Sequence, residues 1–279
     1  MTEPGTVSFH RRVSEQLARA LSSQVDPAAD VARLNDSLRL LAKWRSALLQ
    51  DAWLQHEGNL VKCGPFAGMQ LSQRSGEGCH IAKLIGIYEQ PLWPVLERVL
   101  TEAYDLVLNV GAAEGYYAIG MARRMPGTPV IAHESNPAAR EILARLIELN
   151  GVKERVTPRG LLEPADLRGL EDRRILVVCD IEGGEIDLLS GTVPKSLRYS
   201  DLIVETHDTQ SRPGIAAELA RRFEETHEVT PIADSGMRNF EAPEWFMRLP
   251  HLEQLLCTWE WRSTPTPWLF MTARSKRAG

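Results

Sequence analysis

The sequence predicts an α/β protein built on a doubly wound, mostly parallel β-sheet. From residue 104 onward, short apolar runs that suit buried strands alternate with amphipathic segments that suit helices. The first apolar run ends in a glycine-rich turn, and later runs end in acidic residues. Such alternation places helices on both faces of a parallel sheet, and ligands then bind beyond the carboxyl ends of its strands.

Size and charge narrow the range of functions. The chain has 279 residues, of which 43% are hydrophobic and 25% charged, enough to bury a sizeable core. Its net charge of −5 gives no basic excess, so no nucleic-acid partner is expected. The apolar runs are shorter than the ~20 residues of a membrane span, so no membrane association is expected. Four widely spaced cysteines and an N-terminus without an apolar signal segment favour reduced thiols in the cytoplasm.

The first part of the chain, residues 1–90, is predicted to be a helical extension with a short strand and loop segment. Apolar residues recur at three and four spacing over residues 8–56, and the pattern breaks at Asp26 and Pro27. We expect the apolar faces of these helices to pair in a homodimer. The main domain is then residues 91–279, with a substrate-side insertion around 234–264.

The main domain is expected to begin with a helix at 91–103. Apolar runs predict strands at 105–110, 129–135, 155–160, 174–180, 200–207, 227–233 and 267–273. Segments with helical periodicity lie between them, at 116–125, 137–150, 184–192 and 214–226. The second of these helices begins on a proline and ends at Asn150 and Gly151, which are typical helix boundaries.

The turn after the first strand points to a nucleoside ligand. Gly111 and Gly115 are four residues apart, and Ala113 stands where a dinucleotide fingerprint has its second glycine. Glu134 follows Gly111 by 23 residues, near the spacing at which an acid reaches a ribose. These features favour a nucleoside without pyrophosphate, and S-adenosylmethionine fits. The alternatives are a tight turn without a ligand and a solvated acid.

Five segments in order, "NVGAAEGYYAIG", "HESNP", "LNGVKERV", "DIEGGEIDLLSG" and "IVETH", resemble FkbM-type S-adenosylmethionine-dependent methyltransferases. The resemblance covers about residues 104–208, and its most specific element is "DIEGGE". It implies a Rossmann-like class I methyltransferase fold and methylation of oxygen on small molecules or glycans. The first 90 residues and residues 235–263 lie outside it.

The resemblance also implies roles for individual residues in cofactor binding. Those expected to line the methionine end are Asn109, Gly111, Ala112 and Tyr117. Glu134 is expected to hold the ribose, and Ser135 next to it is expected to bind the cofactor. Those expected to flank the adenine are Gly160, Leu161 and Leu162. Asn109 stands where the wider superfamily has an acid, so it can still accept a hydrogen bond from the cofactor's ammonium but carries no charge.

The stretch "CDIEGGEIDLL" places three acids after the fourth strand. Asp180 and Glu182 are expected to act in catalysis, with Asp180 also touching the cofactor. Glu185 is expected instead to stabilise the start of a helix through the helix dipole. His207, at the end of the fifth strand, is expected to take the acceptor's proton as a general base.

Glu205 lies two residues before His207 and is predicted to share its face of the strand. Together with Asp180, Glu182 and His207 it could instead hold Mg²⁺ or Mn²⁺, so whether a metal binds stays open.

The acceptor is expected to contact the chain outside the cofactor core. Five tryptophans lie there or at the entry to the core: Trp93, Trp245, Trp259, Trp261 and Trp268. Most are expected to pack, and the rest to line an acceptor pocket, where Arg238, Glu260 and Arg262 are candidate polar contacts. Two other functions compete with the methyltransferase. One is a non-catalytic nucleoside-binding module, and the other an NAD-type dehydrogenase, which the missing GxGxxG pattern opposes.

Overall fold

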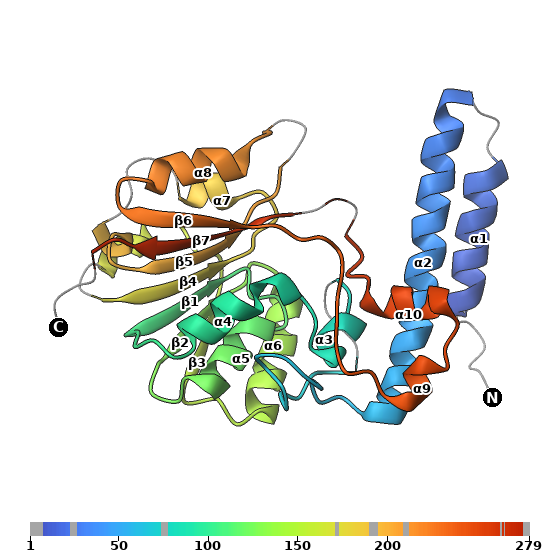
Figure 1. Cartoon of the computed structure of the whole chain (residues 1–279), viewed down its shortest axis with the longest axis horizontal. Coiled ribbons are helices and arrows are strands. Elements are labelled where there is room, and N and C mark those ends of the chain that lie inside the picture. The colour runs from blue at the N-terminus through green and yellow to red at the C-terminus, as the bar shows by residue number, and fades with distance from the viewer. Residues whose placement is uncertain are drawn as a thin grey trace.

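The computed structural model describes residues 8–22, 27–73, 78–170, 173–189, 195–208, 212–262, 264 and 266–275. A β-sheet is covered by helices on both faces, and a long helical hairpin stands beside it (Figure 1). The strands are β1 (Leu106–Val110), β2 (Val130–His133), β3 (Val156–Arg159), β4 (Ile175–Cys179), β5 (Asp201–Glu205), β6 (His227–Ile232) and β7 (Trp268–Ala273).

The helices of the extension are α1 (Phe9–Ser22), α2 (Pro27–Glu57) and α3 (Ile81–Ile85). Those around the sheet are α4 (Trp93–Val99), α5 (Tyr116–Arg124), α6 (Pro137–Leu149), α7 (Glu185–Leu188) and α8 (Ile215–Phe223). The insertion forms α9 (Glu244–Met247) and α10 (His251–Thr258). Short 3₁₀ turns lie at Gln90–Leu92, Asp166–Gly169 and Lys195–Leu197.

The sheet confirms the predicted doubly wound fold. The order of its described strands is β3-β2-β1-β4-β5-β7-β6. β1 to β5 are parallel, and β7 is antiparallel to both β5 and β6. The chain runs outward from β1 in one direction and from β4 in the other, so the strand order reverses between them. A crevice for a ligand is expected beyond the carboxyl ends of these two strands.

The central strands are buried on both faces, which explains their continuous apolar runs. Every residue of β1, β4 and β5 is buried. On β1, Val107 packs into the core shared with α5 and α6, whereas Leu106 and Leu108 pack into the core shared with α8. α7 is shorter than the predicted helix at 184–192, of which residues 190–192 lie outside the described residues.

The extension packs into the same core as the sheet. α1 and α2 occupy the predicted helical region, although the expected break at Asp26 lies outside the described residues. Trp53 of α2 is fully buried against Phe240, Trp245 and Phe246 of the insertion. Because extension and sheet share one apolar cluster, the domain division at residue 90 stays a prediction.

α3 was not expected from the sequence. Its five residues are all buried, and a helix this short cannot display a helical periodicity. None of the described helices has the length and apolar character needed to cross a bilayer.

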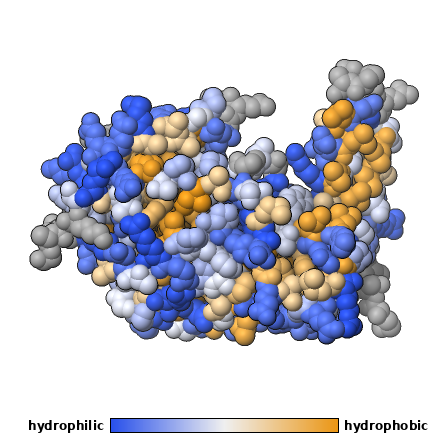
Figure 2. All heavy atoms as spheres, in the orientation of Figure 1, coloured by the Kyte–Doolittle hydropathy of each residue, from blue (hydrophilic) through white to orange (hydrophobic). Residues whose placement is uncertain are grey.

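The helical hairpin exposes an apolar stripe. Val31, Leu34 and Leu38 of α2 are 67%, 62% and 66% exposed, and Figure 2 shows apolar side chains gathered along this hairpin. Apolar residues at three and four spacing on an open helix face are typical of helix pairing. The homodimer through these helices stays a prediction.

If two copies pair through this stripe, replacing Leu34 and Leu38 together with glutamate should convert a dimer to a monomer, because charges would be buried in an apolar seam. Light scattering measures the mass, and circular dichroism checks that the fold is kept. A wild-type protein with the mass of a single chain would reject the pairing.

Candidate functional site

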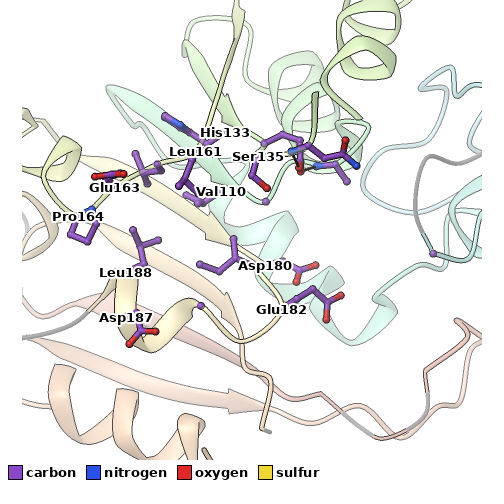
Figure 3. A pocket seen from close by; sticks show the side chains of 18 of the residues that line it. Val110, His133, Ser135, Leu161, Glu163, Pro164, Asp180, Glu182, Asp187 and Leu188 are labelled. Carbon is purple, nitrogen blue, oxygen red and sulfur yellow. Dashed lines mark hydrogen bonds between the residues drawn. The ribbon is translucent and has the colours of Figure 1, made fainter. Parts of the chain in front are cut away.

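The carboxyl ends of β1 to β4 open into a cavity of about 620 Å³, here called the first cavity (Figure 3). The end of each strand and the turn after it contribute to its wall: Val110, Gly111 and Ala113 at β1; His133, Glu134, Ser135 and Asn136 at β2; Leu161, Leu162, Glu163 and Pro164 after β3; Asp180, Ile181 and Glu182 after β4. Lys83 of α3 and Tyr88 add to the wall from the extension. The crevice predicted at the reversal of strand order is therefore present.

Gly111 is required by the backbone, whether or not a ligand is bound. Its φ is +77°, and a Cβ atom placed there would lie 1.6 Å from the carbonyl oxygen of Asp180. Any side chain would therefore push the turn away from β4. The contact of Gly111 with the methionine end of the cofactor stays a prediction.

Glu134 joins two of the turns. Its side chain is 7% exposed, and its two carboxylate oxygens accept hydrogen bonds from the backbone N–H groups of Ala113 (2.8 Å) and Asn136 (2.7 Å). A carboxylate oxygen can accept more than one hydrogen bond. Glu134 can therefore fix the turns after β1 and β2 and still receive a ribose hydroxyl from the cavity.

The structure brings some of the predicted cofactor residues to the cavity wall and not others. Gly111, Glu134, Ser135, Leu161, Leu162 and Asp180 line it. The remaining four, Asn109, Ala112, Tyr117 and Gly160, are not among its lining residues. Asn109 is buried within β1 and donates to the Val178 carbonyl at 3.3 Å, and Tyr117 packs against Trp268. Their predicted contacts with the cofactor are not made from the wall of this cavity.

A second cavity, of about 670 Å³, opens beyond the ends of β4 and β5. Its wall includes Glu205, His207, Arg262 and Thr266. The two cavities share four lining residues: Gly78, Tyr88, Asp180 and Glu182. Asp180 and Tyr88 therefore stand where a ligand in one cavity would meet a ligand in the other.

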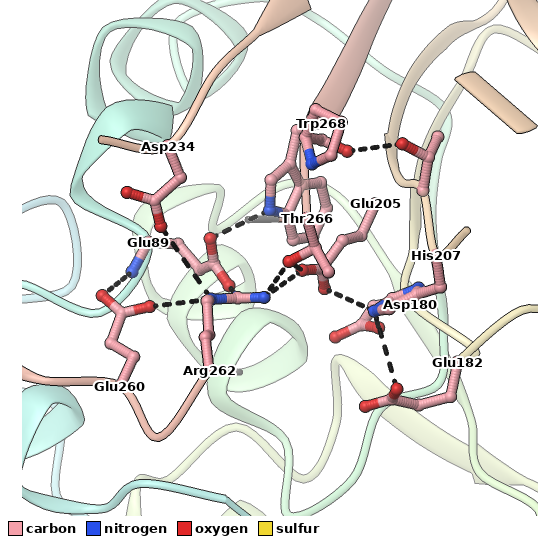
Figure 4. Close-up of polar contacts among 12 residues, drawn as sticks. Glu89, Asp180, Glu182, Glu205, His207, Asp234, Glu260, Arg262, Thr266 and Trp268 are labelled. Carbon is pink, nitrogen blue, oxygen red and sulfur yellow. Dashed lines mark hydrogen bonds and ion pairs between the residues drawn. The ribbon is translucent and has the colours of Figure 1, made fainter. Parts of the chain in front are cut away.

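His207 is surrounded by carboxylates at this junction (Figure 4). Its Nδ1 lies 2.9 Å from Oε1 of Glu185, which as a buried carboxylate accepts the ring proton. Its Nε2 lies 3.8 Å from Asp180, 3.6 Å from Glu182 and 3.6 Å from Glu205. These three distances exceed hydrogen-bond length. With Nδ1 protonated, the lone pair of Nε2 is available to a ligand.

Glu185 is more than the helix-end acid expected from the sequence. It is fully buried, and besides His207 it receives the backbone N–H groups of Ile181 (3.3 Å) and Gly183 (3.1 Å). Burial opposes ionisation, but the hydrogen bond from His207 and those from the backbone outweigh it and lower the pKa of Glu185. Glu185 therefore fixes both the turn after β4 and the orientation of the His207 ring.

The acids at the junction repel one another. Burial raises the pKa of Asp180 to about 6, although His207 lowers it in part. Burial, and then the charge of Asp180, also raise the pKa of Glu205, so this pair of acids binds a proton more readily than isolated carboxyls do. Burial lowers the pKa of His207, but Glu185 and Asp180 outweigh it, and the net shift is upward.

Glu205 is also bound by Arg262, which belongs to a network of arginines and acids. Arg262 donates to Glu205 at 2.5 Å and pairs with Glu89 and Glu260. Arg238, with a side chain only 1% exposed, pairs with Asp234 (2.7 Å) and Glu260 (2.5 Å). Of the three predicted polar contacts, Glu260 and Arg262 line the second cavity and Arg238 supports them from behind.

The part that Glu89 plays in this network was not predicted from the sequence. Glu89 has a left-handed backbone conformation (φ +53°), and it accepts a hydrogen bond from Trp268 Nε1 at 2.9 Å. Its partners lie more than 170 positions away in the sequence, and no local pattern marks them. Of the five tryptophans considered above, Trp261 lines the second cavity, whereas Trp245 stacks on His56 and packs at a tilt against Trp53.

Two acidic groups have a spacing that suits a metal ion within the described part of the chain. One is Asp180, Glu185 and His207, and the other is Glu89, Asp234 and Glu260. The second group already surrounds the guanidinium groups of Arg238 and Arg262, which supply its positive charge. Of these two groups, the one around His207 is therefore the candidate metal site, since it combines carboxylate oxygens with a histidine nitrogen.

No protein-family model matches the chain, and no curated protein matches it. Among solved structures, it is similar to a Klebsiella pneumoniae protein provisionally described as an O-methyltransferase, with 15% identity and a TM-score of 0.45 over 95% of this chain and 97% of that one. Cofactor-bound Rv0187 from MTB is 14% identical over 91% and 100% of the two chains, with a TM-score of 0.45.

TrmK of M. capricolum, in complex with S-adenosyl-homocysteine, is 10% identical over 64% and 68% of the two chains, with a TM-score of 0.41. These are distant likenesses of fold, and the function of this chain has to be inferred from its own residues.

Glu134→Ala should weaken binding of S-adenosylhomocysteine by about 1.5–3 kcal/mol, because hydrogen bonds to a charged acceptor are lost. It should also lower the melting temperature, since Ala113 and Asn136 lose their acceptor. Calorimetric titration measures the affinity. Glu163→Ala, an exposed acid on the same cavity wall, is the matched control and should change neither. Equal affinities for wild type and Glu134→Ala would show that Glu134 does not bind the ribose.

Proposed function

We propose that this protein is an S-adenosylmethionine-dependent O-methyltransferase of the FkbM type, acting on a hydroxyl group of a small molecule or glycan. The observation that carries the proposal is the position of His207. Its Nε2 faces the junction of two cavities, while Glu185 holds its Nδ1. A nucleoside-binding cavity next to an oriented base is the arrangement that methylation of a hydroxyl needs.

The first cavity fits the methyl donor. Glu134 can accept from the ribose, and Leu161 and Leu162 offer an apolar wall to the adenine. Oδ1 of Asp180 is buried and makes no hydrogen bond within the described residues, so it can receive the ammonium of the cofactor. S-adenosylmethionine, when bound, supplies a methyl group on a sulfonium sulfur.

The second cavity fits the acceptor. An acceptor held here would present its hydroxyl oxygen to the methyl group that the bound cofactor would supply, and the sulfur would keep the electron pair of the carbon–sulfur bond. The hydroxyl proton passes to Nε2 of His207. The resulting imidazolium lies among Asp180, Glu182 and Glu205, whose negative charge stabilises it. Glu185 keeps the ring in the tautomer that leaves Nε2 free.

A divalent cation would fit the same group. Nε2 of His207 and the oxygens of Asp180, Glu182 and Glu205 would be its ligands, and Glu185 would orient the histidine, as carboxylates commonly do for metal-bound histidines. Such an ion would act as a Lewis acid on the acceptor oxygen. In that case His207 would be a ligand rather than the base.

His207→Ala should lower turnover by about 10²–10⁴-fold, the usual loss for a general base, and change S-adenosylhomocysteine affinity by less than about 1 kcal/mol. Turnover is measured on the first acceptor that gains the mass of one methyl group in a screen of hydroxyl compounds. His251→Ala, an exposed histidine on α10, serves as the control. Full activity in both His207→Ala and Asp180→Ala would reject this site.

With His207 as the base, activity should persist in excess EDTA. Loss of activity in EDTA, restored by Mg²⁺ or Mn²⁺, would instead assign the acids and His207 to a metal.

Calorimetry against S-adenosylmethionine, S-adenosylhomocysteine and NAD separates the competing functions. Binding of NAD alone would favour a dehydrogenase. Tight binding of the nucleosides without turnover of any acceptor would favour the binding module.

A further inference from the structure

Lys83 is the only cationic side chain among the described residues that line the first cavity. It belongs to α3, in the extension, and its side chain is 6% exposed. Its Nζ donates to Oε1 of Glu114 at 2.7 Å and lies 5.0 Å from the centre of the Tyr88 ring. His133 also lines the cavity, but burial lowers its pKa, so its ring is neutral at physiological pH.

The wall of the first cavity carries more negative than positive charge. Five carboxylates line it: Glu134, Glu163, Asp180, Glu182 and Asp187. The cofactor proposed above carries two cationic groups, a sulfonium and an ammonium, and one carboxylate. The acids suit the two cations. Among the charged residues described on this wall, Lys83 is the one that can pair with the carboxylate.

Four backbone donors of the glycine turn are already used inside the protein. The N–H groups of Gly111 and Ala112 both donate to the carbonyl of His133, at 2.9 and 2.8 Å. The N–H of Ala113 donates to Glu134, and that of Gly115 to the Ala112 carbonyl. An anionic group at this turn therefore gains nothing from these four donors, and a cationic side chain can serve it instead.

Lys83 lies at the end of the cavity where the amino-acid portion of the cofactor belongs. Its partner Glu114 is part of the turn between Gly111 and Gly115. Its neighbour Tyr88 lines both cavities, as Asp180 does. In Figure 3, Asp180 and Glu182 lie at one side of the cavity, away from His133, Glu163 and Pro164. The adenosine portion is expected on that other side, between Glu134 and Leu162.

We propose that Lys83 binds the carboxylate of the amino-acid portion of S-adenosylmethionine, and that Glu114 holds the ammonium of Lys83 in position. The inference rests on the function proposed above. An ammonium has three donors, so Lys83 can keep its bond to Glu114 while it receives the ligand. The extension then completes the cofactor site, because the cation that the sheet domain lacks in this cavity comes from α3.

The test compares two ligands, S-adenosylhomocysteine and its decarboxylated analogue, which keeps the ammonium and lacks only the carboxylate. Calorimetry on the wild-type chain should show about 10–100-fold weaker binding of the analogue, the usual effect of one charge-assisted hydrogen bond. Lys83→Met should weaken S-adenosylhomocysteine binding by a similar factor and leave the affinity for the analogue within about twofold of wild type. Lys153→Met, at an exposed lysine, is the control.

Lys83→Met leaves Glu114 buried beside an apolar side chain, so Lys83→Met with Glu114→Gln is made as well and should show the same selective loss. Lys83→Arg, which keeps the charge, should recover part of the binding of S-adenosylhomocysteine. An equal loss for both ligands would make Lys83 a purely structural residue. Equal wild-type affinities for the two ligands would overturn the proposal for Lys83 alone. A wild-type chain that binds neither ligand would overturn the proposed function together with it.

Discussion

The site depends on the close approach of the ends of β1 and β4. The carbonyl of Asp180 occupies the place where a side chain at position 111 would begin, and the N–H of Asp180 donates to Val110 at 3.0 Å. A glycine at this point lets the first turn lie directly against the acid that follows β4. The two cavities then meet at Asp180, and a ligand held by the first turn is placed next to the second cavity.

Excess negative charge is the second constraint on this junction. Asp180, Glu182, Glu185 and Glu205 surround one histidine, and a single guanidinium, that of Arg262, reaches the group from behind. Such a cluster is costly to bury unless protons or cations compensate it. The raised pKa values of Asp180 and Glu205 favour a bound proton that compensates part of it, and the guanidinium of Arg262 compensates another part. A cationic ligand entering the junction would be stabilised by what remains, and a sulfonium meets that description.

Residues at strand ends could be predicted from the sequence because a parallel sheet brings its carboxyl ends to one edge. This is why Asp180 and His207 were expected together, and the structure places them 3.8 Å apart. The strands were predictable from their apolar runs, because the central strands are buried on both faces. The role of Glu185 was not, because its place at the start of a helix already explained an acid there, and its contact with His207 depends on how α7 packs against the residues that follow β5. α3 was not predicted, because its five residues are all buried and the helix is too short to show a helical periodicity of apolar residues.

The extension was expected from the sequence to pair in a homodimer and to lie outside the cofactor core, and its packing shows what else it contributes. Trp261 of the insertion donates to Ser46 of α2 at 3.0 Å, and the same tryptophan lines the second cavity with Lys43. Tyr88 lines both cavities, and Glu89 anchors Arg262. The walls of the second cavity are therefore built largely by the extension and the insertion together. A change in the packing of α2 against α10 would alter this cavity, the proposed acceptor site, while leaving the turns of β1 and β2 in place.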